Sequence, residues 1–272
     1  MSRATTTILN CMGLSEREVP PASLAARVGA LAYGLVAYLI FLAAFAYAVG
    51  FVGGFITPTR LDGSAAGPLG AAVAINVALL TLFAVQHSVM ARPWFKRRWT
   101  RLVPTPIERS TYVITSGLVM LPLFLGWRPM GGVLWDVQQP VARAAVWALF
   151  ASGWLIVFVS TLLLNHFDLF GLRQVWLFFR GRPYTRLPFK TPGFYGHVRH
   201  PLYVGWMTCF WVTPTMTLAH LLFAVVTTAY MLVAIGWEER DLIEALPEYA
   251  AHRQRVPMLV PRLTRRSSID ER

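Results

Sequence analysis

Two pairs of charged residues in the C-terminal third of the sequence have types and positions that could bind a polar ligand. Arg199 and His200 directly precede Pro201, and proline favours the first position of a helix. Free N–H groups at such a helix start, beside two basic side chains, attract a carboxylate. Glu238 and Glu239 follow the end of an apolar run. A cationic anchor beside an acidic one would suit a zwitterionic ligand, or a ligand with a carboxylate at one end and hydroxyls at the other.

These residues also have structural interpretations. An arginine at a membrane boundary most often fixes the topology of the chain, and the two glutamates could simply form salt bridges with Arg199 or Arg240. His197 could be a solvated loop residue, and Gly205 would allow close approach of a ligand or of a neighbouring helix. His220 is expected near the membrane surface. The histidines lack the carboxylate spacing of a helical metal site, so we expect no metal.

The composition places these residues in a membrane protein. Of the 272 residues, 56% are hydrophobic and only 14% are charged, and the mean hydropathy is +0.50. Soluble domains carry about 25% charged residues, so this composition excludes a disordered chain and argues against a soluble enzyme. The net charge of +12 lies beside apolar runs. It indicates topology signalling and contact with anionic membrane lipid rather than nucleic acid.

Four apolar runs are long enough to cross a membrane, which requires about 20 residues. They cover about 24–52, 68–91, 109–127 and 141–164. A fifth run, 201–236, would be about 54 Å long as one helix, well beyond a hydrocarbon core of about 30 Å. We expect Pro214 to divide it into two helices, 202–213 and 217–236, which form a hairpin.

The distribution of Arg and Lys indicates which side of the membrane each loop faces. The 92–109 and 165–200 segments are rich in basic residues, whereas 53–67 and 128–140 carry one arginine each. This alternation follows the positive-inside rule, so the two rich segments and the N-terminus should face the cytoplasm. The basic C-terminal segment should also be cytoplasmic, and the hairpin supplies the two passes that this requires.

The sequence therefore predicts an all-α, polytopic membrane bundle with five to six membrane helices, including the hairpin at 201–236. A single domain would comprise a four-helix membrane part (24–164) and a more polar part (165–261), which ends in a cytoplasmic helical tail. Pro247 should begin a new helical turn in that tail. We expect an integral protein of the cell membrane, of the bacterial inner-membrane type, with both termini in the cytoplasm.

A longer pattern resembles a known family. The superfamily of isoprenylcysteine carboxyl methyltransferases and phospholipid methyltransferases has residues similar to Arg199-His200-Pro201-Leu202-Tyr203-Val204-Gly205, then Glu238-Glu239, Tyr249 and Val256-Pro257. The upstream residues 165–176 (NHFDLFGLRQVW) resemble one subgroup, the bacterial methanethiol S-methyltransferases, which share an NnrU-like four-helix N-terminal part. With this segment the resemblance spans most of the chain. The R-H-P-x-Y-x-G piece alone is less specific, because membrane sterol reductases carry a similar one.

The resemblance implies that 165–261 is the catalytic part and that it binds S-adenosylmethionine. The cofactor site that we predict comprises Leu187, Pro188, Phe189, Lys190, Tyr195, His197, Arg199, His200, Pro201, Tyr203, Gly205, Glu238 and Glu239. One position departs from the family pattern. The prenylcysteine enzymes place an arginine, which serves their substrate, four residues before the first glutamate, where this chain has Ala234. A small uncharged thiol is compatible with this loss, whereas a carboxylated lipid substrate is not favoured.

The expected reaction is transfer of the activated methyl group to methanethiol, which gives dimethyl sulfide. Alignment of the reactants and exclusion of water are the main requirements. The thiolate is the effective nucleophile, so a base or a positive field near the thiol would help. Candidates are His166, Asp168 and Arg173, which follow the fourth apolar run, although each could be structural. The expected partners are a small thiol and membrane lipid, with no nucleic acid and no metal.

The sequence leaves other functions open. The substrate could be another small thiol, a lipid or a prenylated cysteine. The protein could be a membrane reductase with a nicotinamide cofactor, although the Glu238-Glu239 pair followed by Val256-Pro257 disfavours this function. It could also be a non-catalytic, NnrU-like membrane protein whose cofactor pocket is unused.

Overall fold

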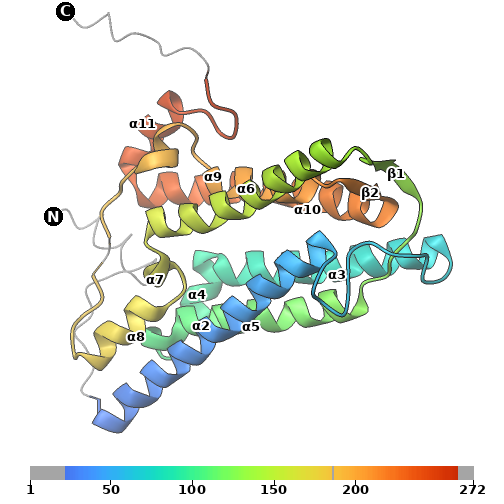
Figure 1. Cartoon of the computed structure of the whole chain (residues 1–272). Coiled ribbons are helices and arrows are strands. Elements are labelled where there is room, and N and C mark those ends of the chain that lie inside the picture. Colours follow the sequence, from blue (N-terminus) through green and yellow to red (C-terminus); the bar gives the residue numbers. More distant parts are fainter. Residues whose placement is uncertain (1–21, 186, 263–272) are drawn as a thin grey trace, which may run out of the picture.

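The computed structural model describes residues 22–185 and 187–262, which form a largely helical bundle (Figure 1). The helices are, in chain order, α2 (Leu24–Gly53), α3 (Leu69–Ala91), α4 (Pro93–Trp99), α5 (Thr105–Gly126), α6 (Pro140–Leu164), α7 (His166–Leu169), α8 (Leu172–Phe179), the 3₁₀ helix η1 (Gly193–Gly196), α9 (Pro201–Trp211), α10 (Leu218–Ala245) and α11 (Pro247–Arg255). Two short strands, β1 (Val133–Asp136) and β2 (Thr215–Thr217), pair antiparallel.

Five helices in the described ranges are long and apolar enough to cross a membrane, namely α2, α3, α5, α6 and α10. The shortest of them, α5, has 22 residues and is about 33 Å long, which suffices for a hydrocarbon core of about 30 Å. It runs on through Pro122. The four predicted spans are therefore confirmed, and the chain is an integral membrane protein with a polytopic helical architecture.

The last apolar run is broken near Pro214, as predicted, and its two halves pack against each other. α9 has only 11 residues and rises about 16 Å, so the helix alone is shorter than a hydrocarbon core of about 30 Å, and the non-helical residues 212–214 connect it to β2. α10 begins after Thr217, whose side chain caps the helix by accepting a hydrogen bond from the His220 N–H. The prediction that this helix ends at 236 was wrong. It continues to Ala245, because the glutamate, arginine and leucine residues that follow favour a helix.

Two glycines allow α9 to lie very close to α6. A Cβ atom on Gly205 would lie 2.8 Å from the Gly153 carbonyl oxygen and 2.8 Å from the Val157 nitrogen. A Cβ atom on Gly153 would lie 2.7 Å from the Cys209 nitrogen. Small residues at a crossing are typical of helix pairs in membranes. Of the two roles expected for Gly205, the structure shows the close approach of a helix.

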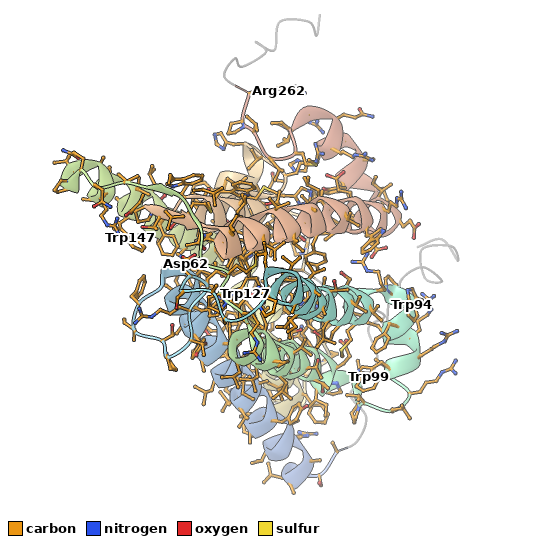
Figure 2. The ribbon with its side chains drawn as sticks, turned by 90° about the vertical axis from the view of Figure 1, so that its right-hand side faces the viewer. Asp62, Trp94, Trp99, Trp127, Trp147 and Arg262 are labelled. Carbon is orange, nitrogen blue, oxygen red and sulfur yellow. The ribbon has the colours of Figure 1, made fainter. Side chains whose placement is uncertain are left out.

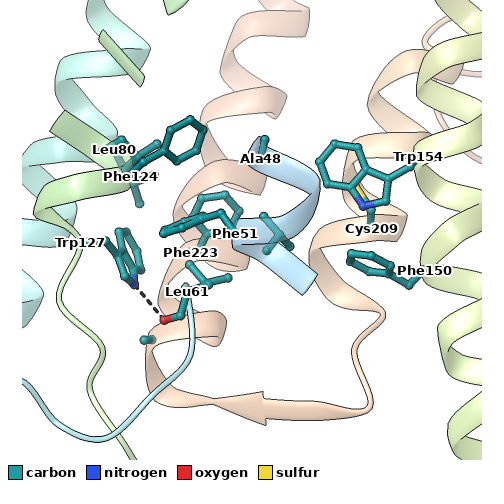
Figure 3. Packing of buried hydrophobic residues seen from close by; sticks show 13 residues of the cluster. Ala48, Phe51, Leu61, Leu80, Phe124, Trp127, Phe150, Trp154, Cys209 and Phe223 are labelled. Atoms are coloured by element: carbon teal, nitrogen blue, oxygen red, sulfur yellow. Dashed lines mark hydrogen bonds between the residues drawn. The ribbon is translucent and has the colours of Figure 1, made fainter. Parts of the chain in front are cut away.

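The bundle has two layers with an aromatic core between them. α6, α9 and α10 form one layer, and α2, α3 and α5 form the other (Figure 1, Figure 2). Side chains from both layers are buried together in the core, among them Phe51, Phe124, Trp127, Trp154, Cys209 and Phe223 (Figure 3). The thiol of Cys209 is free and buried, so this residue packs as a small hydrophobic side chain.

The two ends of the bundle carry different short elements (Figure 1). At the end with β1 and β2, called the β end below, His220 is fully buried. Its Nδ1 lies 3.0 Å from Asp62 Oδ2 and its Nε2 lies 3.0 Å from the Phe210 carbonyl oxygen. His220 lies in the first turn of α10, at the outer end of the return helix as expected, and the loop after α2 and the hairpin turn enclose its side chain. The opposite end, called the α7–α8 end below, also carries η1 and α11.

Candidate active site

Arg199, His200 and Glu239 form a buried cluster at the α7–α8 end, where α9 begins and α10 nears its end. Glu239 Oε1 lies 2.7 Å from Arg199 Nε and 3.0 Å from His200 Nε2. His200 and Glu239 are each 5% exposed. The prediction that the hairpin brings the basic dipeptide and the acidic pair together is therefore confirmed.

Both oxygens of the Glu239 carboxylate are bound by other side chains of the protein. Besides Arg199 and His200, Tyr249 donates a hydrogen bond to Oε1 at 3.3 Å. Arg253 Nε lies 3.0 Å from Oε2. Burial and the nearby Glu239 charge raise the pKa of Tyr249, so its hydroxyl keeps the proton that it donates. In this arrangement Glu239 is an ion-pair partner, which is the structural alternative that the sequence left open.

The same cluster attaches the C-terminal tail to the start of α9. Arg199 Nη1 donates to the carbonyl oxygen of Val256. The Arg199 N–H donates to the Pro257 carbonyl at 2.9 Å. The His200 N–H donates to the Met258 carbonyl at 3.2 Å. The segment after α11 therefore runs beside the residues that precede α9, and this pairing holds α11 over the end of the bundle.

Glu238 has a different partner from Glu239. Successive residues of an α-helix point about 100° apart, so neighbouring glutamates face different groups. The Tyr203 hydroxyl on α9 donates a hydrogen bond to Glu238 Oε2 at 3.1 Å. The acidic pair therefore does not act as one unit, since Glu239 holds the tail and Glu238 stays half-buried beside Tyr203.

A cleft of about 330 Å³ lies between the 189–196 segment and α11. Its lining combines an aromatic ring with hydroxyl, carboxylate, imidazole and guanidinium groups, from Phe189, Thr191, Gly196, Glu248, His252, Arg255 and Val256. The Phe189 ring packs edge-on against Tyr249 and His252, at centroid distances of 6.1 and 5.6 Å. Burial and the nearby Arg199 charge lower the pKa of His252, so its imidazole is neutral at neutral pH.

The predicted cofactor residues of the 187–197 segment have different positions. Phe189 lines the cleft, and Leu187, Pro188 and Lys190 are its neighbours in the chain. Tyr195 is buried and its hydroxyl donates to the Ser160 carbonyl of α6 at 3.5 Å. His197 is exposed, as expected for a solvated loop residue. Its Nδ1 lies 3.2 Å from the Gly193 carbonyl oxygen.

Four polar residues of the cleft were not predicted from the sequence. These are Thr191, Glu248, His252 and Arg255. The last three follow the spacing i, i+4 and i+7 on α11, so they share one face of that helix. This spacing after Pro247 is the signal that could have identified them.

His166, the first candidate for activation of the thiol, is almost completely buried after the end of α6. Its Nδ1 lies 2.8 Å from Thr161 Oγ1 and its Nε2 lies 2.8 Å from the Tyr38 hydroxyl. Burial lowers the pKa of His166. Four phenyl rings pack around the imidazole, those of Phe41, Phe158, Phe167 and Phe170. The sequence did not reveal Tyr38, which comes from the middle of the first span.

Asp168 and Arg173, the other two candidates, bind each other. Arg173 Nη1 lies 3.0 Å from Asp168 Oδ1. The Tyr184 hydroxyl donates to Asp168 Oδ2 at 3.1 Å, and burial together with the Asp168 charge raises the pKa of Tyr184 to about 12. Arg173 also donates to the carbonyl oxygen and the hydroxyl of Thr185, both at 2.9 Å. These contacts tie α7 and α8 to the segment at 184–185.

Two adjacent residues of α6 connect the His166 cluster with the 187–197 segment. The Ser160 carbonyl accepts the hydrogen bond from Tyr195, and Thr161 binds His166. Burial, together with the Glu238 charge, raises the pKa of the Tyr195 phenol. The last turns of α6 therefore link the candidate base to the segment that borders the cleft.

Comparison with known proteins assigns the family. A methanethiol S-methyltransferase of Mycobacterium tuberculosis is 54% identical over 230 residues, which cover 84% of this chain and 94% of that protein. A methanethiol S-methyltransferase of Crocosphaera subtropica is 52% identical over 246 residues, which cover 90% of this chain and 96% of that protein. The chain belongs to the methanethiol S-methyltransferase family.

Nurim is a more distant relative. Nurim of Mus musculus is 34% identical over 185 residues, which cover 63% of this chain and 68% of that protein. No family model matches the chain, and no solved structure gives a significant match. Membership of the methanethiol S-methyltransferase family makes this chain a methyltransferase and does not favour the reductase or the non-catalytic function.

Within residues 22–185 and 187–262, no group of three or more His, Cys, Asp or Glu side chains lies close enough together to hold a metal ion. The polar residues of the α7–α8 end instead bind one another and the backbone.

Proposed function

We propose that this protein transfers the methyl group of S-adenosylmethionine to methanethiol and releases dimethyl sulfide. The observation that carries the proposal is the identity of 54% and 52% to two methanethiol S-methyltransferases over 84% and 90% of the chain. The gathering of a polar cleft and a buried base at one end of a membrane bundle supports it. A membrane site also suits a small apolar product, which can leave through lipid.

The cleft beside α11 has the chemistry that S-adenosylmethionine requires. Its volume of about 330 Å³ falls within the range of roughly 300–1,000 Å³ for small-molecule sites. Phe189 offers a face for stacking of the adenine ring, Glu248 can accept hydrogen bonds from the ribose hydroxyls, and Arg255 can bind the carboxylate. His252, neutral at neutral pH, adds a further hydrogen-bonding group.

The protein contributes alignment, exclusion of water and removal of the thiol proton. The bound cofactor supplies a methyl group that is already activated by the positive charge on its sulfur. Glu239 and Arg199 hold the tail that forms one wall of the cleft. Ala234 is buried on α10 and places no cation near the substrate, which suits an uncharged thiol. His166 is the candidate base, because burial lowers its pKa and so leaves the imidazole neutral and able to accept a proton at neutral pH.

We also propose that the α7–α8 end faces the cytoplasm and contacts anionic lipid. The short helix α4 combines exposed Trp94 with the basic residues Lys96, Arg97 and Arg98. Figure 2 shows Trp94 and Trp99 together at one end of the molecule. Aromatic and basic residues on a short helix are typical of the membrane surface. A second cavity of about 520 Å³, between α3 and α10 and beside Trp94, offers room for a lipid chain. Its lining carries basic and acidic residues, among them Arg240 and Glu244.

A headspace assay tests the reaction. Purified protein with methanethiol and S-adenosylmethionine should produce dimethyl sulfide, measured by gas chromatography of the gas phase, and no product should form without the cofactor. Methylation of a lipid or of a different thiol, with no dimethyl sulfide, would overturn the proposed substrate. Calorimetry should show binding of S-adenosylmethionine, and no binding at millimolar cofactor would overturn the proposed cofactor.

A further inference from the structure

The hydrogen bonds of His166 fix which of its ring nitrogens carries the proton. The Thr161 hydroxyl has one hydrogen, and it donates that hydrogen to the Phe158 carbonyl at 2.7 Å. The same hydroxyl lies 2.8 Å from His166 Nδ1, so in this contact it must accept. His166 therefore carries its proton on Nδ1 and leaves Nε2 with a free lone pair.

Tyr38 covers that lone pair. Its hydroxyl lies 2.8 Å from His166 Nε2, and because Nε2 can only accept, the phenol donates. The Tyr38 ring packs at right angles to the imidazole, at a centroid distance of 5.6 Å. His166 is 4% exposed, whereas Tyr38 is only partly buried. The Tyr38 hydroxyl therefore stands between His166 Nε2 and a proton donor that approaches from the Tyr38 side.

The charged groups around His166 do not compete for its proton. On α7 and α8, Asp168 is already paired with Arg173. From α5, Arg109 binds the Leu169 carbonyl at 2.8 Å through its Nε atom. The contacts that α2 and α6 make with the imidazole come from hydroxyl groups and phenyl rings. Nε2 is thus the unprotonated nitrogen of a neutral imidazole, and the Tyr38 phenol is hydrogen-bonded to it.

We infer that Tyr38 and His166 form a proton relay that takes the thiol proton during methyl transfer, an inference that rests on the proposed function. The S–H bond breaks as its proton passes to the Tyr38 oxygen. The Tyr38 O–H proton passes at the same time to His166 Nε2. The freed electron pair on sulfur forms the new S–CH₃ bond as the cofactor's bond to that methyl group breaks. The products are dimethyl sulfide, S-adenosylhomocysteine and an imidazolium on His166, which later returns its proton to solvent.

Activity measurements on two tyrosine variants test the relay. Tyr38→Phe removes the hydroxyl that carries the proton and should lower kcat by about 100-fold or more, the usual scale of acid–base catalysis. Affinity for S-adenosylmethionine should stay unchanged. Tyr33→Phe is the matched control, because Tyr33 lies on the same helix and its hydroxyl bonds to Thr111, away from His166. A Tyr38→Phe enzyme as active as Tyr33→Phe would overturn the relay.

A double variant and a spectrum separate the relay from a general structural effect. His166→Gln should slow the reaction as much as Tyr38→Phe, and the double variant should be no slower, because both changes break one path. If the double variant instead lost as much activity as both single variants together, the two residues would not share one proton path. Nitrogen NMR of histidine-labelled protein should show His166 protonated at Nδ1 only, and Tyr38→Phe should shift the Nε2 signal while Tyr33→Phe leaves it in place. A protonated Nε2 would contradict the inference even if the enzyme methylates another thiol. Failure of the wild-type protein to make dimethyl sulfide concerns the proposed function alone.

Discussion

Glu239 and Arg199, which lie 40 residues apart in the sequence, form a buried ion pair at 2.7 Å that joins α10 to the residues before α9. The side chain of Arg199 is 10% exposed and that of Glu239 is 7% exposed. Arg199 also binds the backbone of the tail. One carboxylate thus connects the hairpin with the segment that covers its open end. This connection explains why a basic dipeptide, an acidic residue and a Val-Pro tail occur together in the sequence.

Loss of the Glu239 carboxylate should destabilise the protein. Glu239→Ala leaves Arg199 and His200 buried without an acidic partner, and removal of one member of a buried ion pair costs about 3–5 kcal/mol. Thermal unfolding in detergent should show a clear decrease in Tm. Glu244→Ala, which removes an exposed carboxylate from the same helix, is the control and should change Tm little. Equal Tm values for the two variants would show that the cluster does not hold the tail.

The cleft should lose affinity for S-adenosylmethionine when its charged lining is removed. Arg255→Ala and Glu248→Ala each delete a group that faces the cleft, and loss of a charge-assisted hydrogen bond of about 1.5–3 kcal/mol corresponds to at least a tenfold weaker Kd. Calorimetry measures this change directly. Gln254→Ala, an exposed neighbour on α11, serves as the control. Should all three variants bind the cofactor equally well, the cofactor must lie elsewhere.

The crossing of α6 and α9 should not tolerate a side chain at Gly205. An added Cβ atom would lie 2.8 Å from backbone atoms of Gly153 and Val157, which cannot move aside as a flexible side chain can. We expect Gly205→Ala to cost about 1–3 kcal/mol through overpacking. Gly236→Ala on α10 is the matched control, because nothing lies within 4 Å of its Cβ position. It should be neutral or stabilise the helix, by up to about 1 kcal/mol. Similar melting curves for both alanine variants would contradict the close crossing.

The spans could be predicted from the sequence because the length of an apolar run is a direct physical requirement for crossing lipid. The break at Pro214 was also predictable, since one uninterrupted helix would be too long for the membrane. The end of α10 was not. Charged residues near a membrane surface signal the boundary of the span, but they also favour helices, so α10 continues through Glu238 and Glu239 to Ala245.

Within the site, proximity was predictable but individual partners were not. The predicted hairpin placed Arg199 near the two glutamates. Which glutamate binds Arg199 depends on the rotation of α10 about its axis, because adjacent side chains of a helix point about 100° apart. The sequence around Tyr38 does not indicate a functional role. Tyr38 lies in an apolar span, where a tyrosine is common, and its partner His166 is 128 residues away. Such contacts depend on how whole helices pack, which the local sequence does not encode.

Acidification should reduce activity through His166. Burial lowers the pKa of this imidazole below its ordinary value of 6.5, so Nε2 is unprotonated at neutral pH and the relay is fully available. As the pH falls below 6.5 towards the lowered pKa, the imidazole gains a proton. Nε2 can then no longer accept the thiol proton, so kcat/KM decreases. Stability should change in the same direction, because the unfolded chain binds this proton at a higher pH than the folded one.

His252 is the group most easily confused with His166 in such a profile, because its pKa is also lowered. The pH dependence of kcat/KM should therefore be measured for wild type, His166→Gln and His252→Asn. The decrease on the acid side should be absent from the slow His166→Gln enzyme and should persist in His252→Asn, since His252 lines the cofactor cleft and takes no part in the relay. If the decrease instead persists in His166→Gln and is absent from His252→Asn, the titrating group is His252 in the cofactor cleft. His166 would then take no part in the reaction.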